Sequence, residues 1–257
     1  MSLAQVVKTA QREKGIALMT HIIVGYPNIE ANWDILEGFE MAGVDVVELQ
    51  FPFSEPIADG PLFAKANQTA IDQGTTISQC FEIMKEITDK YSFKVVVVAY
   101  YNTAFKAGEE NFCQLLSQAG ASGMIIPDLP IEEASLFQEM AVKYNLSWIP
   151  LVAPTNSLER LKEISASVKN ETSFVYAVAR KGVTGRETTF EDLNVEYFDH
   201  LQEAFKMPIG IGFGISKPEH IEMLRGKVSL AVIGTAVLKE YEVNGQSGVV
   251  HLLQSLR

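Results

Sequence analysis

The chain has 257 residues, of which 47% are hydrophobic and 21% charged, and its net charge at pH 7 is −11. This is an ordinary globular composition, and the acidic balance argues against nucleic acid or an anionic membrane as the main partner. No stretch approaches the roughly 20 apolar residues of a membrane span, and the N-terminal residues lack the apolar run of a signal peptide. We therefore expect a single domain over residues 1–257. With only Cys80 and Cys113, we expect a reduced, cytoplasmic protein.

Short β-branched runs alternate along the chain with stretches of helical periodicity, after an amphipathic N-terminal segment that we expect to form an extra helix. Strands are predicted at residues 17–27, 44–49, 94–100, 123–130, 147–154, 173–179, 208–214 and 229–235. Helices are predicted between them at residues 29–43, 112–120, 132–145, 158–168 and 218–226. In these, Ile35 and Phe39 share one face, Glu132 and Glu133 suit a first helical turn, and Pro218 suits a first position.

Continuous apolar strands of this kind are typical of a parallel sheet that is buried on both faces. Eight strand–helix units in a chain of this length predict a single (β/α)8 TIM barrel. The alternative is a doubly wound open sheet, which usually has fewer strands and a glycine-rich dinucleotide turn after the first one. The turn found there, VGYPN, lacks that fingerprint, so the barrel is favoured.

Two connections are longer than the others and predict long loops after the second and sixth strands. The first surplus falls on residues 50–74 and the second on residues 180–194. In a barrel of this class the chemistry lies on the loops that follow the strands. The loop at Lys181–Arg186 is therefore either a mobile lid or a plain connector.

Two carboxyl groups lie where such a barrel would use them. Glu48 ends an apolar strand, and if it points inward, loss of solvation would raise its pKa toward the range of a general acid and base. The other interpretation is an outward residue paired with a helix. Asp59 lies in the turn sequence IADGP, where an aspartate before glycine often serves the turn alone.

Glycines after the last two strands predict a phosphate site, because backbone N–H groups at a helix N-terminus bind phosphate without cationic side chains. The alternative is that these glycines only permit tight turns. Tyr100 and Tyr176, near the ends of the third and sixth strands, are either core residues or part of the site wall. The glycines in question are Gly210, Gly212 and Gly214, together with Gly234 beside Thr235.

The segment ELQFPFSEPIADGP (48–61) resembles the signature of the tryptophan synthase alpha chain family, whose usual form is E-L-G-x-P-F-S-D-P-x-A-D-G-P. The similarity continues in family order through AYYN (99–102), AGASGMIIPDLPIEE (119–133), LVAPT (151–155), RKGVTG (180–185), GFGIS (212–216) and IGTAV (233–237). The resemblance therefore covers nearly the whole chain.

The resemblance implies a carbon–carbon lyase (EC 4.2.1.20 type) of tryptophan biosynthesis. Such an enzyme cleaves indole-3-glycerol phosphate to indole and glyceraldehyde 3-phosphate in a retro-aldol step. By matching position, Glu48 is the general acid and base and Asp59 the second catalytic carboxylate. The other expected site residues are Tyr100, Tyr176 and Thr184 for the substrate, and Gly185, Gly214, Gly234 and Thr235 for its phosphate.

The resemblance also implies a beta chain as partner in an α2β2 complex. Pyridoxal phosphate is expected only in that partner, so we expect no cofactor and no metal in this chain. Residues 53–60 and 179–190 would communicate with the beta chain, with Thr184 on a mobile loop that orders Asp59.

This chain departs from the family pattern at three positions: Gln50 replaces a glycine, Glu55 replaces an aspartate, and Thr235 replaces a common serine. Two alternatives stay open. One is another phosphate-sugar barrel enzyme, such as indole-glycerol-phosphate synthase, although that enzyme requires a lysine at a strand end. The other is a catalytically weak chain that acts as scaffold or activator of a beta subunit.

Overall fold

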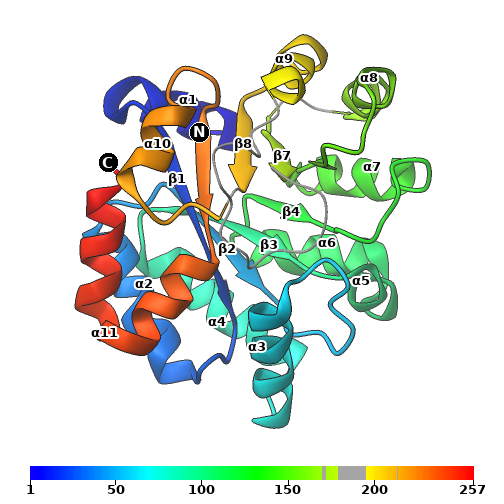
Figure 1. Cartoon of the computed structure of the whole chain (residues 1–257). Coiled ribbons are helices and arrows are strands. Elements are labelled where there is room, and N and C mark those ends of the chain that lie inside the picture. Colours follow the sequence, from blue (N-terminus) through cyan, green and yellow to red (C-terminus); the bar gives the residue numbers. More distant parts are fainter. Residues whose placement is uncertain (170–171, 179–194, 213) are drawn as a thin grey trace.

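The computed structural model describes residues 1–169, 172–178, 195–212 and 214–257. Within them, parallel strands form one sheet in the order β5-β4-β3-β2-β1-β9-β8-β7-β6, enclosed by a ring of helices (Figure 1). The strands are β1 (Ala17–Ile23), β2 (Val46–Gln50), β3 (Lys94–Val98), β4 (Gly123–Ile125), β5 (Ser147–Trp148), β6 (Leu151–Val152), β7 (Val175–Val178), β8 (Ile209–Gly212) and β9 (Leu230–Ile233).

The sheet closes on itself through the fifth predicted strand, residues 147–154, which is split into β5 and β6. Ile149 N–H still donates to the carbonyl of Met124 at 3.1 Å, whereas the carbonyl of Pro150 accepts from Tyr176 N–H at 2.9 Å. Proline has no N–H for a ladder, so the chain changes its pairing partner here from β4 to β7. The two ends of the strand order are thus joined by the chain. The predicted (β/α)8 barrel is confirmed.

The predicted N-terminal extra helix is also confirmed, and it covers the end of the barrel at which the strands begin. Leu3 and Val7 of α1 pack with Met19, Phe174 and other side chains of the barrel interior. A second, larger core lies between the strands and the outer helices. The helices are α1 (Leu3–Lys14), α2 (Ile29–Met41), α3 (Pro61–Asp72), α4 (Ile77–Lys90), α5 (Tyr101–Ala107), α6 (Glu109–Gln118), α7 (Ser135–Lys143), α8 (Leu158–Ser167), α9 (Val195–Ala204), α10 (Pro218–Leu224) and α11 (Thr235–Ser255).

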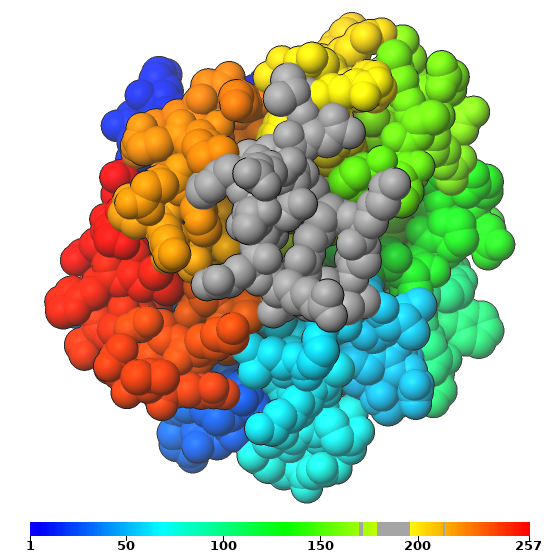
Figure 2. Space-filling view, in the orientation of Figure 1, coloured from blue at the N-terminus to red at the C-terminus, as the bar shows by residue number. Residues whose placement is uncertain are grey.

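Nearly half of the expected loop at residues 50–74 is helical, which corrects the prediction. Pro61 occupies a first-turn position of α3, where its fixed φ and missing N–H cost nothing. Phe63 on the buried face of α3 packs with Leu238 of α11, and the two helices lie side by side in Figure 2, α3 in cyan and this part of α11 in orange-red. The loop after β2 is therefore residues 51–60, between the end of β2 at Gln50 and the first residue of α3 at Pro61.

The predicted helices otherwise differ from the structure only at their ends. Ile35 and Phe39 are fully buried on one face of α2, and Pro218 begins α10, both as predicted. Helix α7 begins at Ser135, so Glu132 and Glu133 precede it rather than lying in its first turn. The second long loop falls outside the described residues. Across the residues that the structure describes, no helix is long and apolar enough to cross a membrane.

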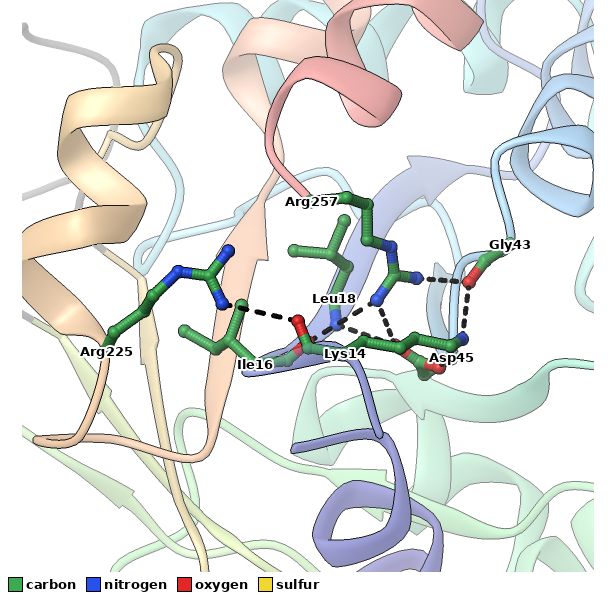
Figure 3. A network of polar contacts seen from close by, with 7 residues as sticks. All are labelled: Lys14, Ile16, Leu18, Gly43, Asp45, Arg225 and Arg257. Carbon is green, nitrogen blue, oxygen red and sulfur yellow. Dashed lines mark hydrogen bonds and ion pairs between the residues drawn. The ribbon is translucent and has the colours of Figure 1, made fainter. Parts of the chain in front are cut away.

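Buried Asp45 links the last residue of helix α1 to the C-terminal arginine at the end of the barrel where the strands begin. Asp45 accepts hydrogen bonds from Lys14 Nζ at 2.7 Å, from the guanidinium of Arg257 at 3.1 Å and from Leu18 N–H at 2.9 Å. In Figure 3 the C-terminal arginine reaches between Asp45 and Gly43, whose carbonyl it also contacts. This network lies at the end of the barrel opposite the loops that follow the strands.

Candidate active site

The side chains of β2 alternate between the two cores, and this alternation turns Glu48 inward. Val46 belongs to the barrel interior, whereas Val47 and Leu49 belong to the outer core. Glu48 follows the parity of Val46, and only 3% of it is exposed. Burial, followed by the negative charge of Asp59, raises the pKa of Glu48 to about 8. Its carboxyl group is therefore mostly protonated at neutral pH and able to act as an acid.

His21 on β1 lies beside this carboxyl group and was not identified from the sequence. It pairs with Glu48 in the strand register, and its Nδ1 is 3.6 Å from Glu48 Oε2. Burial lowers the pKa of His21 to about 4, with the Gln50 side chain acting in the opposite direction, so the imidazole is neutral at pH 7. The signal was present in the sequence, since His21 has the same parity along β1 as the interior residue Met19.

Asp59 is held at the mouth of the barrel by side chains from three different segments. Its Oδ2 accepts hydrogen bonds from Gln50 Nε2 at 2.7 Å, Asn67 Nδ2 at 3.2 Å and Tyr100 Oη at 3.3 Å. Burial raises its pKa, while these three donors lower it by stabilising the carboxylate. Its N–H also closes a turn onto Pro56. Turn chemistry is thus only part of what this aspartate does.

Tyr100 and Tyr176 both lie in the site, but in different ways. The hydroxyl of Tyr100 accepts from Ala58 N–H at 3.1 Å besides donating to Asp59, so this tyrosine orders the loop that carries the aspartate. Burial, and to a smaller extent the negative charges of Glu48 and Asp59, raises the pKa of Tyr176 on β7 well above its usual value. That either tyrosine contacts a substrate stays a prediction.

Two of the glycines expected to bind phosphate serve packing within the barrel. Gly210 and Gly212 lie inside β8, within the strand predicted at residues 208–214. A Cβ atom at Gly210 would be 2.9 Å from the side chain of Leu230, and one at Gly212 would be 2.8 Å from the hydroxyl of Tyr176. Glycine is required at these two positions because neighbouring side chains fill the space.

The remaining phosphate candidates lie at strand ends. Gly214 is exposed and has a φ of 66°, a conformation that favours glycine. Gly234 is the N-cap of α11, which begins at Thr235. A Cβ atom at Gly234 would be 3.2 Å from Phe63 and 3.5 Å from Cβ of His21, so this helix end borders the site. Gly185, a further phosphate candidate, and Thr184, which is expected to contact the rest of the substrate, lie outside the described residues.

The inner wall of the site carries buried polar atoms that are weakly paired within the described part of the chain. Glu48 Oε2, His21 Nε2 and Gln50 Oε1 have no close hydrogen bond to a described residue, although Glu48 Oε2 is 3.6 Å from His21 Nδ1 and the Gln50 side chain acts on the imidazole. Buried polar atoms are usually hydrogen-bonded in folded proteins. These positions of β1 and β2 therefore give the inner wall a polar surface suited to a polar ligand. Among the described residues, no group of three His, Cys, Asp or Glu side chains could hold a metal ion.

Comparisons with known proteins agree with this geometry. The family model described as tryptophan synthase alpha chain matches residues 7–255. The tryptophan synthase alpha chain of Desulfotalea psychrophila is 39% identical over the full length of both chains. A solved structure of Mycobacterium tuberculosis tryptophan synthase superposes with a TM-score of 0.89 at 25% identity, covering 98% of this chain and 95% of that one. A chain of the tryptophan synthase a2b2 complex from Pyrococcus furiosus gives 0.81 at 26% identity, covering 93% and 97%. The chain belongs to the tryptophan synthase alpha chain family.

Proposed function

We propose that this chain catalyses the alpha reaction of tryptophan biosynthesis, the retro-aldol cleavage of indole-3-glycerol phosphate to indole and glyceraldehyde 3-phosphate. The observation that supports it best is a pair of neighbouring acids in contrasting environments. Glu48 is buried, and no described residue donates a hydrogen bond to its Oε2, whereas Asp59 is held by three hydrogen-bond donors. One group is thereby kept protonated and the other is favoured as a carboxylate.

In this mechanism Glu48 works first as acid and then as base. Its carboxyl proton goes to C3 of the indole ring, which leaves the ring nitrogen positively charged. Asp59 accepts the hydrogen bond of that N–H and stabilises the charge. The Glu48 carboxylate then removes the proton from the side-chain hydroxyl. The bond between C3 and the carbon that carries this hydroxyl then breaks. Its electron pair restores the C2=C3 double bond of indole, the C=N pair returns to the ring nitrogen, and the aldehyde forms.

We propose that the phosphate group is bound by Gly185, Gly214, Gly234 and Thr235, with the N-terminus of α11 as its positive end. Backbone N–H groups and a helix dipole supply this attraction locally. A net charge of −11 is therefore compatible with a phosphate substrate. Tyr176 and Thr184 are proposed to contact the rest of the substrate.

We further propose that the chain works with a beta chain in an α2β2 complex, in which only the partner holds pyridoxal phosphate. The relatives' complexes support such a partner, and residues 53–60 and 179–190 are the proposed communicating loops. A reduced, cytoplasmic setting belongs to the same proposal and is supported by Cys80 and Cys113, both buried as free thiols. On this basis the chain alone is weakly active and is strongly stimulated by its partner.

The experiment is indole release from indole-3-glycerol phosphate by the purified chain, titrated with a beta subunit from the same source. Glu48→Gln should abolish turnover while substrate still binds, and Glu86→Gln, an exposed glutamate on α4, is the matched control. Wild-type turnover in Glu48→Gln would refute the assigned role. No indole from any preparation would leave the scaffold function, whereas turnover of another sugar phosphate would favour a different barrel enzyme.

A further inference from the structure

We infer that Gln50 is a positioning residue for the cleavage reaction, one that holds the Asp59 carboxylate in its working place through a direct hydrogen bond. The inference rests on the proposed function for the role of Asp59 itself. It assigns a role to a side chain that the family pattern lacks, because that pattern has glycine at this position.

The contact between Gln50 and Asp59 is short, and its donor is buried. Gln50 is fully buried at the end of β2, and its Nε2 donates to Oδ2 of the half-buried Asp59 at 2.7 Å. The same amide nitrogen lies 3.3 Å from Oδ1 of Asn67, whose own amide nitrogen donates to Asp59 at 3.2 Å. A hydrogen bond to a charged acceptor is among the stronger ones in a protein.

The scaffold on both sides of this contact is fixed. Gln50 is set by the ladder between β2 and its neighbours, in which it pairs with Ile23 and Val98. Asn67 is fixed on α3 by donating to the carbonyl of Phe63 at 2.8 Å and accepting from Phe53 N–H at 3.0 Å. Of the three segments, only the loop that carries Asp59 is irregular. The side-chain amides of Gln50 on β2 and Asn67 on α3 therefore hold this aspartate in place.

The contact also selects which carboxylate oxygen remains for a substrate. All the hydrogen bonds that described residues make to this carboxylate go to Oδ2, from Gln50, Asn67 and Tyr100. Oδ1 is then the oxygen suited to accept a ring N–H. The donors on Oδ2 oppose the effect of burial on the pKa of Asp59, with Gln50 first among them. Gln50 thus acts on both the place and the charge of the aspartate.

The test compares Gln50→Met with Gln68→Met. Methionine keeps the volume of the buried side chain and removes only the amide. Gln68 makes the same kind of bond, Nε2 to Asp72 Oδ1 at 2.7 Å, on the exposed face of α3. The first measurement is the carboxyl ¹³C NMR titration of Asp59 in the ligand-free protein. The second is kcat and KM for indole release as a function of pH.

If the inference is right, Gln50→Met raises the pKa of Asp59 and lowers kcat about 10- to 100-fold, the loss expected for a hydrogen bond to a charged group. KM should change much less, and the acidic limb of the pH profile should move to higher pH. Gln68→Met should leave all of these unchanged. Gln50→Glu, nearly isosteric but acidic, should raise the pKa of Asp59 further and provides a second variant should the methionine disturb folding.

An Asp59 titration that is the same in folded Gln50→Met or Gln50→Glu as in the wild type would overturn the inference. So would a normal acidic limb with a reduced kcat, since that pattern describes general loss of packing. Failure of the proposed function looks different, because the wild-type chain would then release no indole while the NMR titration still responded to Gln50.

Discussion

The substitution Glu48→Gln should stabilise the folded chain, and the gain should depend on pH. The fold raises the pKa of Glu48 from 4.5 to about 8, so ionising it costs free energy in the folded state only. For an acid with a raised pKa, stability is intact below pH 4.5 and is lost as pH rises toward 8. At about 1.4 kcal/mol per pKa unit, the loss is about 3 kcal/mol at pH 7 and about 5 kcal/mol above pH 8.

Glutamine has the shape of the protonated acid and cannot ionise, so it removes this loss. Urea unfolding of Glu48→Gln and wild type from pH 4.5 to 9 measures it directly, with Glu86→Gln as control. The difference in the free energy of unfolding should start near zero, reach about 3 kcal/mol at pH 7 and level off above pH 8. A difference independent of pH would mean that Glu48 titrates like an exposed acid, and the argument for its catalytic acidity would fail.

Three further outcomes follow from the same contacts. In the pH profile of kcat/KM, activity should fall as pH rises through about 8, because the acid form of Glu48 begins the reaction, and a flat profile to pH 9.5 would contradict this. Gly234→Ala should raise KM about tenfold, the equivalent of one lost hydrogen bond, with little change in kcat. The reason is that the added methyl group contacts Phe63 at the edge of the proposed phosphate site. An unchanged KM would show that Gly234 is not part of that site. Asp45→Ala should lower the free energy of unfolding by about 2–4 kcal/mol without changing kcat, since it leaves Arg257 without its carboxylate, and urea denaturation checks this.

The barrel was predictable from the sequence because its signals are local. Each strand is a continuous apolar run, and period-two alternation places Glu48 inward. What was missed depends on contacts between distant segments. Residues 147–154 form two strands because the carbonyl of Pro150 accepts a hydrogen bond from Tyr176 of β7. No local sequence pattern distinguishes such a split strand from a continuous one. Helix α3 was missed because the turn residues of IADGP led to the prediction of a loop that continues past Pro61, where the helix begins.

The candidate site shows the same division. Glu48 and Asp59 were identified by position and motif, but the side chains that tune them were not. Asn67 lies within a helix that the sequence analysis expected to be loop, and His21 is one polar residue in an apolar strand. Gly210 and Gly212 were considered for either a phosphate site or tight turns, because the sequence does not distinguish a glycine of that kind from one that leaves room for a neighbouring side chain. Only the positions of Leu230 and Tyr176 separate these uses.

The two acids of the site depend on each other for their charge states. Burial raises the pKa of both, more completely for Glu48, and hydrogen-bond donors oppose this rise on Asp59, which has three, whereas no described residue donates to Glu48 Oε2. The negative charge of Asp59 in turn raises the pKa of Glu48, so whatever keeps Asp59 ionised also keeps Glu48 protonated. Removing the Gln50 amide should move the acidic limb of the pH profile to higher pH and so narrow the profile, whereas a defect of packing alone would lower the whole profile without narrowing it.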